Sequence, residues 1–503
     1  MSFSAAHPSS FLKLVIPLFL SCSIFFYPSS GWSKNQSFIS LRDRIAAHQG
    51  ASGAYVLEKG DEALLVRSWM VNNAEKSIDI LTFIWSLDNI GMIATDSLLR
   101  AAERGVQVRA VVDDMVLKKE DVEILLALSL HPNFEIRIYN PVQTVGVSMA
   151  EMVVNVLTDF RRFNQRLHNK TFLVDSLIGL TGGRNVANEY FDHDQEYNFL
   201  DRDIMVAGPV AGSMQDNFEI YWRSELSRPI EELLPARRSA LDQDDLQALY
   251  EEVHECAERL LAQIPLAQSI LEEQDEKISR LLKQMVWTED IWFVSDLPVK
   301  NIDKQGLGGG SIMADAVAEA IAEAREEIVL QMPYLIFEGE AYGLFEKLRQ
   351  GIEVRISTNS LASTDNIAAF SGYWRQRQEL LDAGFLIREF NPQPAIEPNL
   401  AQGLQGPGKS PIFVLHAKSL IIDGELLYIG TFNIDPRSAH LNTEEGIFVR
   451  NRQLAQLVEK QIVREMMPWN SWDPRVTNPN AKASWGRRFK LNFYRILPIV
   501  PLL

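Results

Sequence analysis

Apolar residues in the first half of the chain recur with two different spacings. Stretches where they recur every three or four residues predict amphipathic helices, and short continuous or alternating runs predict buried strands. The predicted elements are the helix Asp61–Lys76, the strand Ser77–Trp85, the helix Ala94–Arg104, the strand Val106–Val112, the helix Glu120–Leu130 and the strand Phe134–Tyr139. Helices alternating with short strands indicate an α/β fold whose sheet is mainly parallel and flanked by helices.

The second half repeats this order. Its predicted elements are the helix Ala314–Arg325, the strand Glu327–Tyr334, the helix Tyr342–Gln350, the strand Ile352–Ser357, the helix Ser371–Ala383 and the strand Phe385–Phe390. A repeat as long as a domain indicates two homologous domains rather than a solenoid. We place these domains at 55–226 and 291–475.

Two polar segments lie outside these patterns. Residues 227–290 are strongly charged with helical spacing, which predicts a solvated helical connector without chemistry of its own. The Pro/Gly-rich segment Asn391–Pro411 is long for an unstructured loop, and such loops often form the rim of a functional site.

Two further segments each have two interpretations. The apolar stretch Val145–Leu157 is either a buried core helix or a lip that admits acyl chains. Residues 476–503 form a tail of interleaved cations and large apolar residues, which suits either a membrane interface or docking on the core.

The N-terminal segment 1–33 resembles an export signal. Leu14–Tyr27 is almost wholly apolar, follows Lys13 and precedes small residues of the kind at which signal peptides are cleaved. The apolar run is short for a membrane span, although an uncleaved anchor is the alternative. Cleavage of the segment followed by lipidation at Cys22 is a second, less favoured alternative.

Composition narrows the class of protein. The chain has 503 residues, 46% of them hydrophobic, and a formal charge of −17, which argues against a general nucleic-acid binder. Cys22 and Cys256 are its two cysteines, too few for a disulfide framework or a cysteine zinc site.

One spacing of chemically active residues occurs twice. Leu167–Asp175 reads Leu-His-Asn-Lys-Thr-Phe-Leu-Val-Asp and Leu415–Asp423 reads Leu-His-Ala-Lys-Ser-Leu-Ile-Ile-Asp. On a strand, His and the Lys two residues later point to the same side, which suits a phosphate. A single His on an apolar strand is as often a buried core residue, but two copies 248 residues apart, each followed by Gly and Asn, are not expected by chance.

These two His-x-Lys-x4-Asp copies identify the chain as similar to the phospholipase D superfamily, and most like the bacterial cardiolipin synthases of the C type. The likeness extends to Phe160–Asn164, Arg166, Gly182–Val186 and Gly208–Val210. Thr431 stands where Ser is commoner in the family, and Gly183 lacks a hydroxyl. The resemblance implies two phospholipase D-like domains packed as a pseudo-twofold pair, with one active site at their interface.

The resemblance also implies the chemistry. One neutral imidazole attacks a phosphodiester and forms a phosphohistidine, while the other, protonated, protonates the leaving alkoxide. We assign His168 as the nucleophile and His416 as the acid, although the sequence is symmetric on this point. Donors for the phosphate oxygens are Lys170, Lys418, Asn185 and Asn433, which leave no need for a metal or another cofactor.

Carboxylates are needed to orient the two imidazoles. The motif aspartates, Asp175 and Asp423, belong to the catalytic motifs, yet they lie too far along an extended strand to reach their own His, so a structural role is expected. Glu444 matches the family's orienting position in the second half. In the first half Asp201 and Asp203 compete, and the two-residue period favours Asp201.

The resemblance and the segment properties lead to one functional prediction. The chain is expected to be a phosphatidyltransferase that makes cardiolipin from two phospholipids, one of them phosphatidylglycerol. A phospholipase D that releases phosphatidic acid is the alternative, and a nuclease or an inactive scaffold is less favoured. Expected partners are phospholipids and a membrane surface but not nucleic acid, and an accessory protein is left open. The expected location is the periplasmic side of a bacterial envelope.

Overall fold

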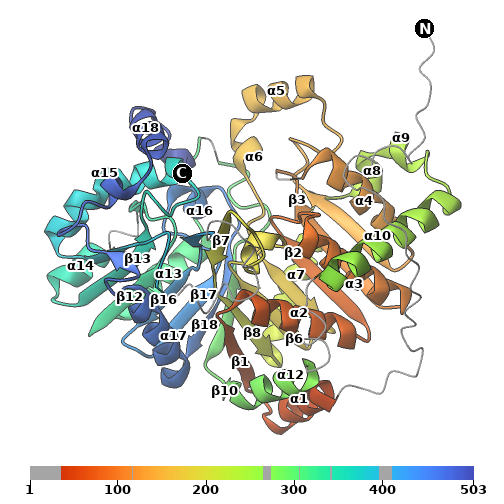
Figure 1. Cartoon of the computed structure of the whole chain (residues 1–503), viewed down its shortest axis with the longest axis horizontal. Helices are drawn as coiled ribbons and strands as arrows, with labels where there is room; N and C mark the ends of the chain where they lie inside the picture. The colour runs from red at the N-terminus through yellow and green to blue at the C-terminus, as the bar shows by residue number, and fades with distance from the viewer. Residues whose placement is uncertain (1–35, 116, 264–273, 305, 340–342, 396–410) are drawn as a thin grey trace.

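The computed structural model describes residues 36–115, 117–263, 274–304, 306–339, 343–395 and 411–503. The chain forms two lobes side by side, the first half running from red to yellow and the second from teal to blue (Figure 1). The predicted N-terminal signal or anchor at 1–33 and most of Asn391–Pro411 lie outside the described residues. None of the described helices is both long enough and apolar enough to cross a membrane.

The first lobe is built on a nine-stranded sheet. From edge to edge its strands are β10 (Val286–Thr288), β1 (Ser52–Leu57), β8 (Asp203–Ala207), β6 (Ile178–Gly182), β5 (Thr171–Val174), β2 (Ser77–Thr82), β3 (Gln107–Asp113), β4 (Phe134–Tyr139) and β9 (Ser227–Pro229). The helices packed on one face are α2 (Gly60–Asn73), α3 (Asn89–Glu103) and α4 (Lys119–Ser129). Helix α7 (Pro209–Trp222) packs on the other face.

The second lobe repeats this arrangement on eight strands. In the matching order they are β11 (Ile291–Ser295), β18 (Glu445–Arg450), β17 (Leu426–Gly430), β16 (Ser419–Ile422), β12 (Glu327–Gln331), β13 (Glu353–Asn359), β14 (Leu386–Phe390) and β19 (Ser471–Trp472). The helices are α13 (Ile312–Glu323), α14 (Gly343–Arg349), α15 (Ile367–Ala383) and α17 (Arg452–Glu465), the last corresponding to α7. The predicted duplication is confirmed.

The sheets are mixed, so the prediction of mainly parallel sheets was wrong in that detail. In the described strands of the two large sheets, parallel pairing is confined to the three successive strands of the helix-connected part, β2–β3–β4 and β12–β13–β14. The motif strands β5 and β16 pair antiparallel on both sides. The reason is the connection: β5 and β6 are joined by three residues, and so short a link permits only antiparallel pairing.

The two lobes share a core and a pseudo-twofold axis. Apolar residues from both sheets and from α7 and α17 form one cluster, including Phe218 from the first lobe and Ile447 from the second. Strand β7 (Tyr197–Leu200) pairs in parallel with β15 (Ile412–Leu415), and the corresponding bridge joins Leu167 to Thr443. Each chain segment leading to a motif histidine therefore pairs with the other lobe.

The connector is helical as predicted, but it packs on the first lobe. Its helices are α8 (Ile230–Leu233), α9 (Pro235–Arg238), α10 (Gln243–Gln263) and α12 (Gln274–Gln284). The Tyr250 hydroxyl donates to the carbonyl of Ala127 at 2.8 Å, and Ile278 is buried in the first core beside α2. Its two ends also supply the edge strands β9 and β10, so the connector is part of the first lobe's structure.

Candidate active site

The two motif histidines lie at the lobe interface, each fixed by a backbone bond to the opposite lobe. The amide of His168 donates to the carbonyl of Thr443 at 3.1 Å, and that of His416 to the carbonyl of Leu200 at 2.8 Å. Both side chains are buried, and the charge of His416 lowers the pKa of His168, so the rings share one environment. The structure brings the two motif copies together.

Each histidine is paired with a carboxylate from the other lobe. His168 Nδ1 lies 2.8 Å from Glu444 Oε2, and His416 Nδ1 lies 2.6 Å from Asp201 Oδ2. Asp203, the competing candidate, instead forms an ion pair with Arg67 at 2.8 Å. A carboxylate on Nδ1 fixes the ring orientation and leaves Nε2 for chemistry. One acid per half was foreseen; the crossing of the pairs is what the structure adds.

The two pairs differ in charge. Burial lowers the pKa of His168 well below its usual value, and the charges of Lys170 and Lys418 lower it further. Burial also raises the pKa of its partner Glu444 to about 7. Both members of this pair are therefore readily neutral near pH 7.

The second pair is ionised more easily. Burial alone would raise the pKa of Asp201, but the charge and hydrogen bond of His416 hold it below its ordinary range. Burial and Lys418 lower the pKa of His416, while ionised Asp201 opposes that shift. A carboxylate that stays charged favours a proton on the adjacent imidazole, so His416 is better suited than His168 to carry one.

The motif lysines are buried beside the histidines. Lys170 Nζ donates to the carbonyl of His168 at 2.8 Å, and Lys418 Nζ donates to that of His416 at 2.5 Å. Lys418 Nζ also lies 3.2 Å from His416 Nε2. Burial lowers the pKa of Lys170 to about 7 and that of Lys418 to about 8. A phosphate anion entering here would restore their charge.

The two asparagines are buried in the turns after β6 and β17. Asn185 Oδ1 accepts from the amide of Ile84 at 3.2 Å, which leaves the amide nitrogen as a donor. Asn433 Oδ1 has no hydrogen-bond partner among the described residues. Their phosphate-binding role stays a prediction. Across the described parts of the chain, no group of three or more His, Cys, Asp or Glu side chains is placed to hold a metal ion.

Sequence reasoning missed the residues that hold the start of each motif. Asp113 Oδ2 accepts from the amide of Leu167 at 2.7 Å. Asn359, its counterpart at the end of β13, accepts from the amide of Leu415 at 3.0 Å and donates to the carbonyl of the same residue at 2.7 Å. The sequence signal that could have identified these residues is the polar residue that ends the second parallel strand in each half.

The residue after each orienting acid was also missed. Glu445 accepts from the hydroxyls of Thr171 and Thr181 at 2.7 and 2.8 Å. Its counterpart Arg202 donates to the hydroxyl of Ser419 at 2.8 Å. Each therefore reaches across the interface to the opposite motif strand, with opposite charge in the two lobes. Adjacency to Glu444 and Asp201 was the only sequence signal.

The motif aspartates bind backbone and not the histidines, which is the geometry expected of a structural role. Asp175 accepts backbone N–H bonds from residues 75, 76 and 77, where β2 begins, and Asp423 from residues 325, 326 and 327, where β12 begins. Both residues have positive φ, 54° and 52°. Each ties the end of a motif strand to the start of its antiparallel neighbour.

Removing one of these carboxylates should reduce stability but not the chemistry. For Asp175→Ala we expect the free energy of unfolding to fall by about 2 kcal/mol, because three backbone N–H groups, that of Ser77 half-buried, lose a charged acceptor. Asp175→Asn, which keeps one oxygen and tolerates positive φ, should lose less. Chemical denaturation measures both. A large loss of kcat in folded Asp175→Asn would contradict the structural role.

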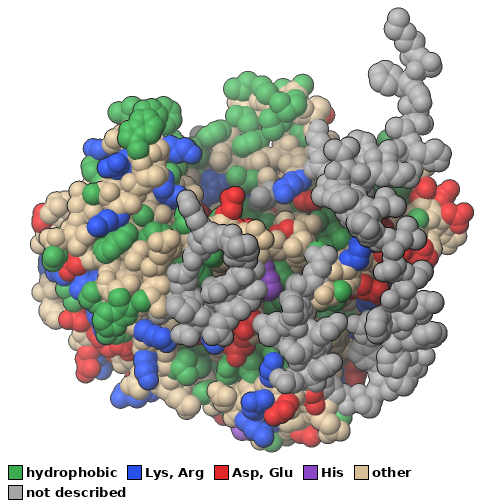
Figure 2. All heavy atoms as spheres, in the orientation of Figure 1, with side chains coloured by type: hydrophobic (Ala, Val, Ile, Leu, Met, Phe, Trp, Pro, Cys, Tyr) green, Lys and Arg blue, Asp and Glu red, His purple; other side chains and the backbone are tan. Residues whose placement is uncertain are grey.

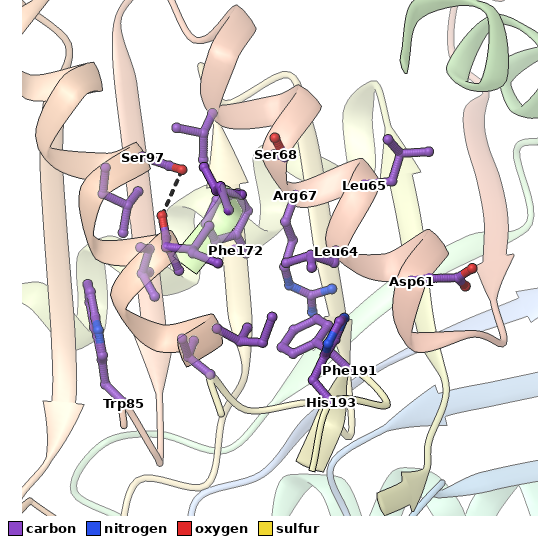
Figure 3. Close-up of a pocket in the computed structure, with 18 of the residues that line it drawn as sticks. Asp61, Leu64, Leu65, Arg67, Ser68, Trp85, Ser97, Phe172, Phe191 and His193 are labelled. Atoms are coloured by element: carbon purple, nitrogen blue, oxygen red, sulfur yellow. Dashed lines mark hydrogen bonds between the residues drawn. The ribbon is translucent and has the colours of Figure 1, made fainter. Parts of the chain in front are cut away.

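A well-formed cavity lies elsewhere. It measures about 150 Å³ and sits between α2, α3 and the first sheet, lined mainly by apolar side chains such as Leu64, Phe172 and Phe191 (Figure 3). None of the motif histidines, lysines and aspartates lines it. The candidate active site is therefore at the lobe interface and not in this cavity.

Comparison with known proteins gives one family. The sequence profile described as "Cardiolipin synthase, PLD-like domain" matches residues 69–222 and 317–466. The chain is similar to cardiolipin synthase C of Escherichia coli K12, with 31% identity over 88% of this chain and 89% of the relative. It is 23% identical to cardiolipin synthase A of Wigglesworthia glossinidia brevipalpis, over 93% and 80%. The crystal structure of Haemophilus influenzae phosphatidylserine synthase shares the fold, with a TM-score of 0.58 at 13% identity over 92% and 100%.

Proposed function

The chain belongs to the cardiolipin synthase family of phospholipase D-like phosphatidyltransferases, and from that premise we propose that it transfers a phosphatidyl group to phosphatidylglycerol, giving cardiolipin. The observation that carries the proposal is the pair of buried histidines, each on a carboxylate of the opposite lobe, with two buried lysines beside them. This set supplies a nucleophile, a proton donor and cations for one phosphodiester.

In the first step His168 acts as the nucleophile. Its Nε2 lone pair attacks the phosphorus of the donor lipid and forms a P–N bond, while the P–O bond to the headgroup breaks. The headgroup alkoxide takes the proton from Nε2 of His416. The lowered pKa of His168 and the ionised partner of His416 support this division of roles.

In the second step the roles of His416 reverse. Its neutral Nε2 takes the proton from a hydroxyl of phosphatidylglycerol, the oxygen attacks the phosphorus, and the P–N bond to His168 breaks. Lys170, Lys418 and the side-chain nitrogens of Asn185 and Asn433 stabilise the negative charge on the phosphoryl oxygens. Water in place of the lipid hydroxyl would make the same steps a phospholipase D reaction.

A defined lipid assay tests the function. Purified full-length protein is incubated with phospholipid mixtures that contain or lack phosphatidylglycerol, and the products are identified by mass spectrometry. Cardiolipin that forms only with phosphatidylglycerol supports the proposal. Phosphatidic acid as the sole product would show that the enzyme is a hydrolase and not a transferase. EDTA should leave the rate unchanged, because four side-chain donors serve the phosphate. Cleavage of DNA without lipid would instead indicate a nuclease.

The pH dependence should reflect the buried lysines. Because burial lowers their pKa values to about 7 and about 8, raising the pH through this range removes positive charge from the free enzyme. We expect kcat/KM to fall between pH 7 and 9. The fall in kcat should come at higher pH, since bound phosphate stabilises the ammonium forms. If kcat/KM fell only near pH 10, about the ordinary pKa of lysine, this expectation would be wrong.

The substrates also suggest where the protein works. Phospholipids reside in bilayers, so we propose that the enzyme acts at a membrane surface, on the periplasmic side of a bacterial envelope. Fractionation of cells with a protease-accessibility assay tests this location. Complete degradation in intact cells with a permeabilised outer membrane is expected, and full protection would place the protein on the other side of the inner membrane.

A further inference from the structure

Helix α5 (Met149–Thr158) is an apolar helix without a buried side. None of its ten residues, all of them described, is buried, and Met149 and Leu157 are 75% and 78% exposed. The core-helix interpretation of this stretch is therefore wrong. Figure 1 shows α5 projecting from the first lobe. A capping box formed by Ser148 and Glu151 stabilises its N-terminus, so the apolar surface is presented on an ordered helix.

Helix α18 (Trp485–Tyr494) is a second exposed apolar projection. It docks on the second lobe with Leu491 as its one buried residue, all of its positions being described, while Trp485 and Phe489 are 73% and 61% exposed. The tail is thus docked on the core, as one interpretation held, yet its large apolar residues face outward. Arg488, Lys490 and Arg495 accompany them, and no acidic residue occurs between 485 and 503.

The two projections lie on one side of the molecule. Figure 1 places both along the same edge, α18 above the second lobe and α5 above the first. In Figure 2 two separate apolar groups mark this edge, with Lys and Arg side chains below them. On a chain with net charge −17, the cations of α18, with no acidic residue from 485 to 503, form a local positive cluster beside this edge.

One arginine near the active site contacts the segments that follow both projections. Arg437 lies in the short helix α16 (Pro436–His440), and its charge adds to the burial that lowers the pKa of His168. Its guanidinium donates to the carbonyl of Leu502 at 3.2 Å, in the segment that follows α18. It also donates to the carbonyl of Asn164 at 3.3 Å, at the end of α6 (Phe160–Asn164), which follows α5.

We propose that α5 and α18 together form a two-point docking surface for a bilayer containing anionic phospholipid. The exposed Met, Val and Leu side chains of α5 match the apolar boundary of such a bilayer, and the Trp and Phe side chains of α18, interleaved with Lys and Arg, also match its negative surface. Arg437 contacts the segments that follow both helices, so it links this docking surface to the lobe interface. The inference rests on the proposed function, since the substrates are membrane lipids.

Vesicle binding of the full-length protein provides the first test. One variant carries Met149→Gln, Val153→Gln and Leu157→Gln, and another carries Trp485→Gln, Phe489→Gln and Phe493→Gln. We expect each to bind phosphatidylglycerol vesicles about tenfold more weakly in a flotation assay, and high salt to weaken the wild type. Leu457→Gln, at an exposed residue of the otherwise packed helix α17, is the control and should bind like the wild type. Unchanged binding of both triple variants would refute the surface.

A fluorescent probe of insertion into the bilayer distinguishes docking through α5 and α18 from vesicle binding through the N-terminal segment. An environment-sensitive fluorophore is attached to cysteine introduced as Leu157→Cys, Phe489→Cys or Leu457→Cys, in a chain with Cys22→Ser and Cys256→Ser. Blue-shifted emission on phosphatidylglycerol vesicles is expected at positions 157 and 489 and not at 457. No shift at 157 and 489, or an equal shift at all three, would overturn the proposal. Thermal melts confirm that the variants are folded.

Activity on two substrate forms separates this inference from the proposed function. The triple variants should retain the wild-type rate on short-chain phospholipids dissolved as monomers, and lose about tenfold on vesicles. If the wild type makes no cardiolipin from either form while the fluorophores still shift, the function is wrong and the docking surface stands. If cardiolipin forms and the variants are unaffected on vesicles, the docking surface is wrong and the function stands.

Discussion

Replacing His168 with alanine is expected to lower kcat by about 10⁴-fold or more, with little change in thermal stability. The Nε2 atom of His168 forms the P–N bond, and the other imidazole of the site, His416, is needed as the proton donor. His416→Ala should be as severe, because both steps need its proton. Rates of cardiolipin formation measure the effect, and His48→Ala, at an exposed histidine, is the control.

The direction of attack can be read from the intermediate. Quenching the wild-type reaction at alkaline pH and digesting the protein should give a phosphatidyl adduct on the peptide containing His168. His416→Ala should accumulate little adduct, since the headgroup alkoxide lacks its proton donor. An adduct on His416 instead would mean that His416 is the nucleophile and His168 is the proton donor. Lipid transfer that persists in both alanine variants would remove the shared-site mechanism altogether.

Asp201→Asn should impair catalysis far more than Glu444→Gln. Asp201 keeps its charge because His416 holds its pKa below the ordinary range, so the neutral amide removes the charge that stabilises the protonated imidazole. We expect kcat to fall about 10²- to 10⁴-fold, as for comparable His–Asp pairs. Burial raises the pKa of Glu444 to about 7, so much of it is already neutral and glutamine should cost only about tenfold.

The contrast between these two substitutions is the measurement of interest. Both are isosteric amides at fully buried positions, so each serves as the other's control for packing. The kcat and KM of each variant should be determined with the same lipid pair, together with its melting temperature. A larger loss for Glu444→Gln would mean that His168, and not His416, is the histidine that must carry charge.

Several parts of the fold followed from local pattern. Helices and strands such as α2, β3 and β14 lie within a few residues of the predicted ranges, because amphipathic spacing reflects which side of an element is buried. The 248-residue offset between the motifs gave the duplication. Strand direction did not follow, since a run of apolar residues looks the same in a parallel and an antiparallel ladder, and the hairpin from β5 to β6 settled it.

The candidate active site was likewise predicted in part from the sequence and in part decided by the tertiary structure. Sequence alone determined that two His-x-Lys copies exist and that their aspartates could not reach their own histidines, while the family resemblance implied that Asp201 and Glu444 were the acids to expect. Only the tertiary structure decided that Glu444 serves His168 and Asp201 serves His416, and which pair stays charged. The physical reason is that these pairings cross a lobe interface, and that pKa values depend on burial and on neighbours far apart along the chain.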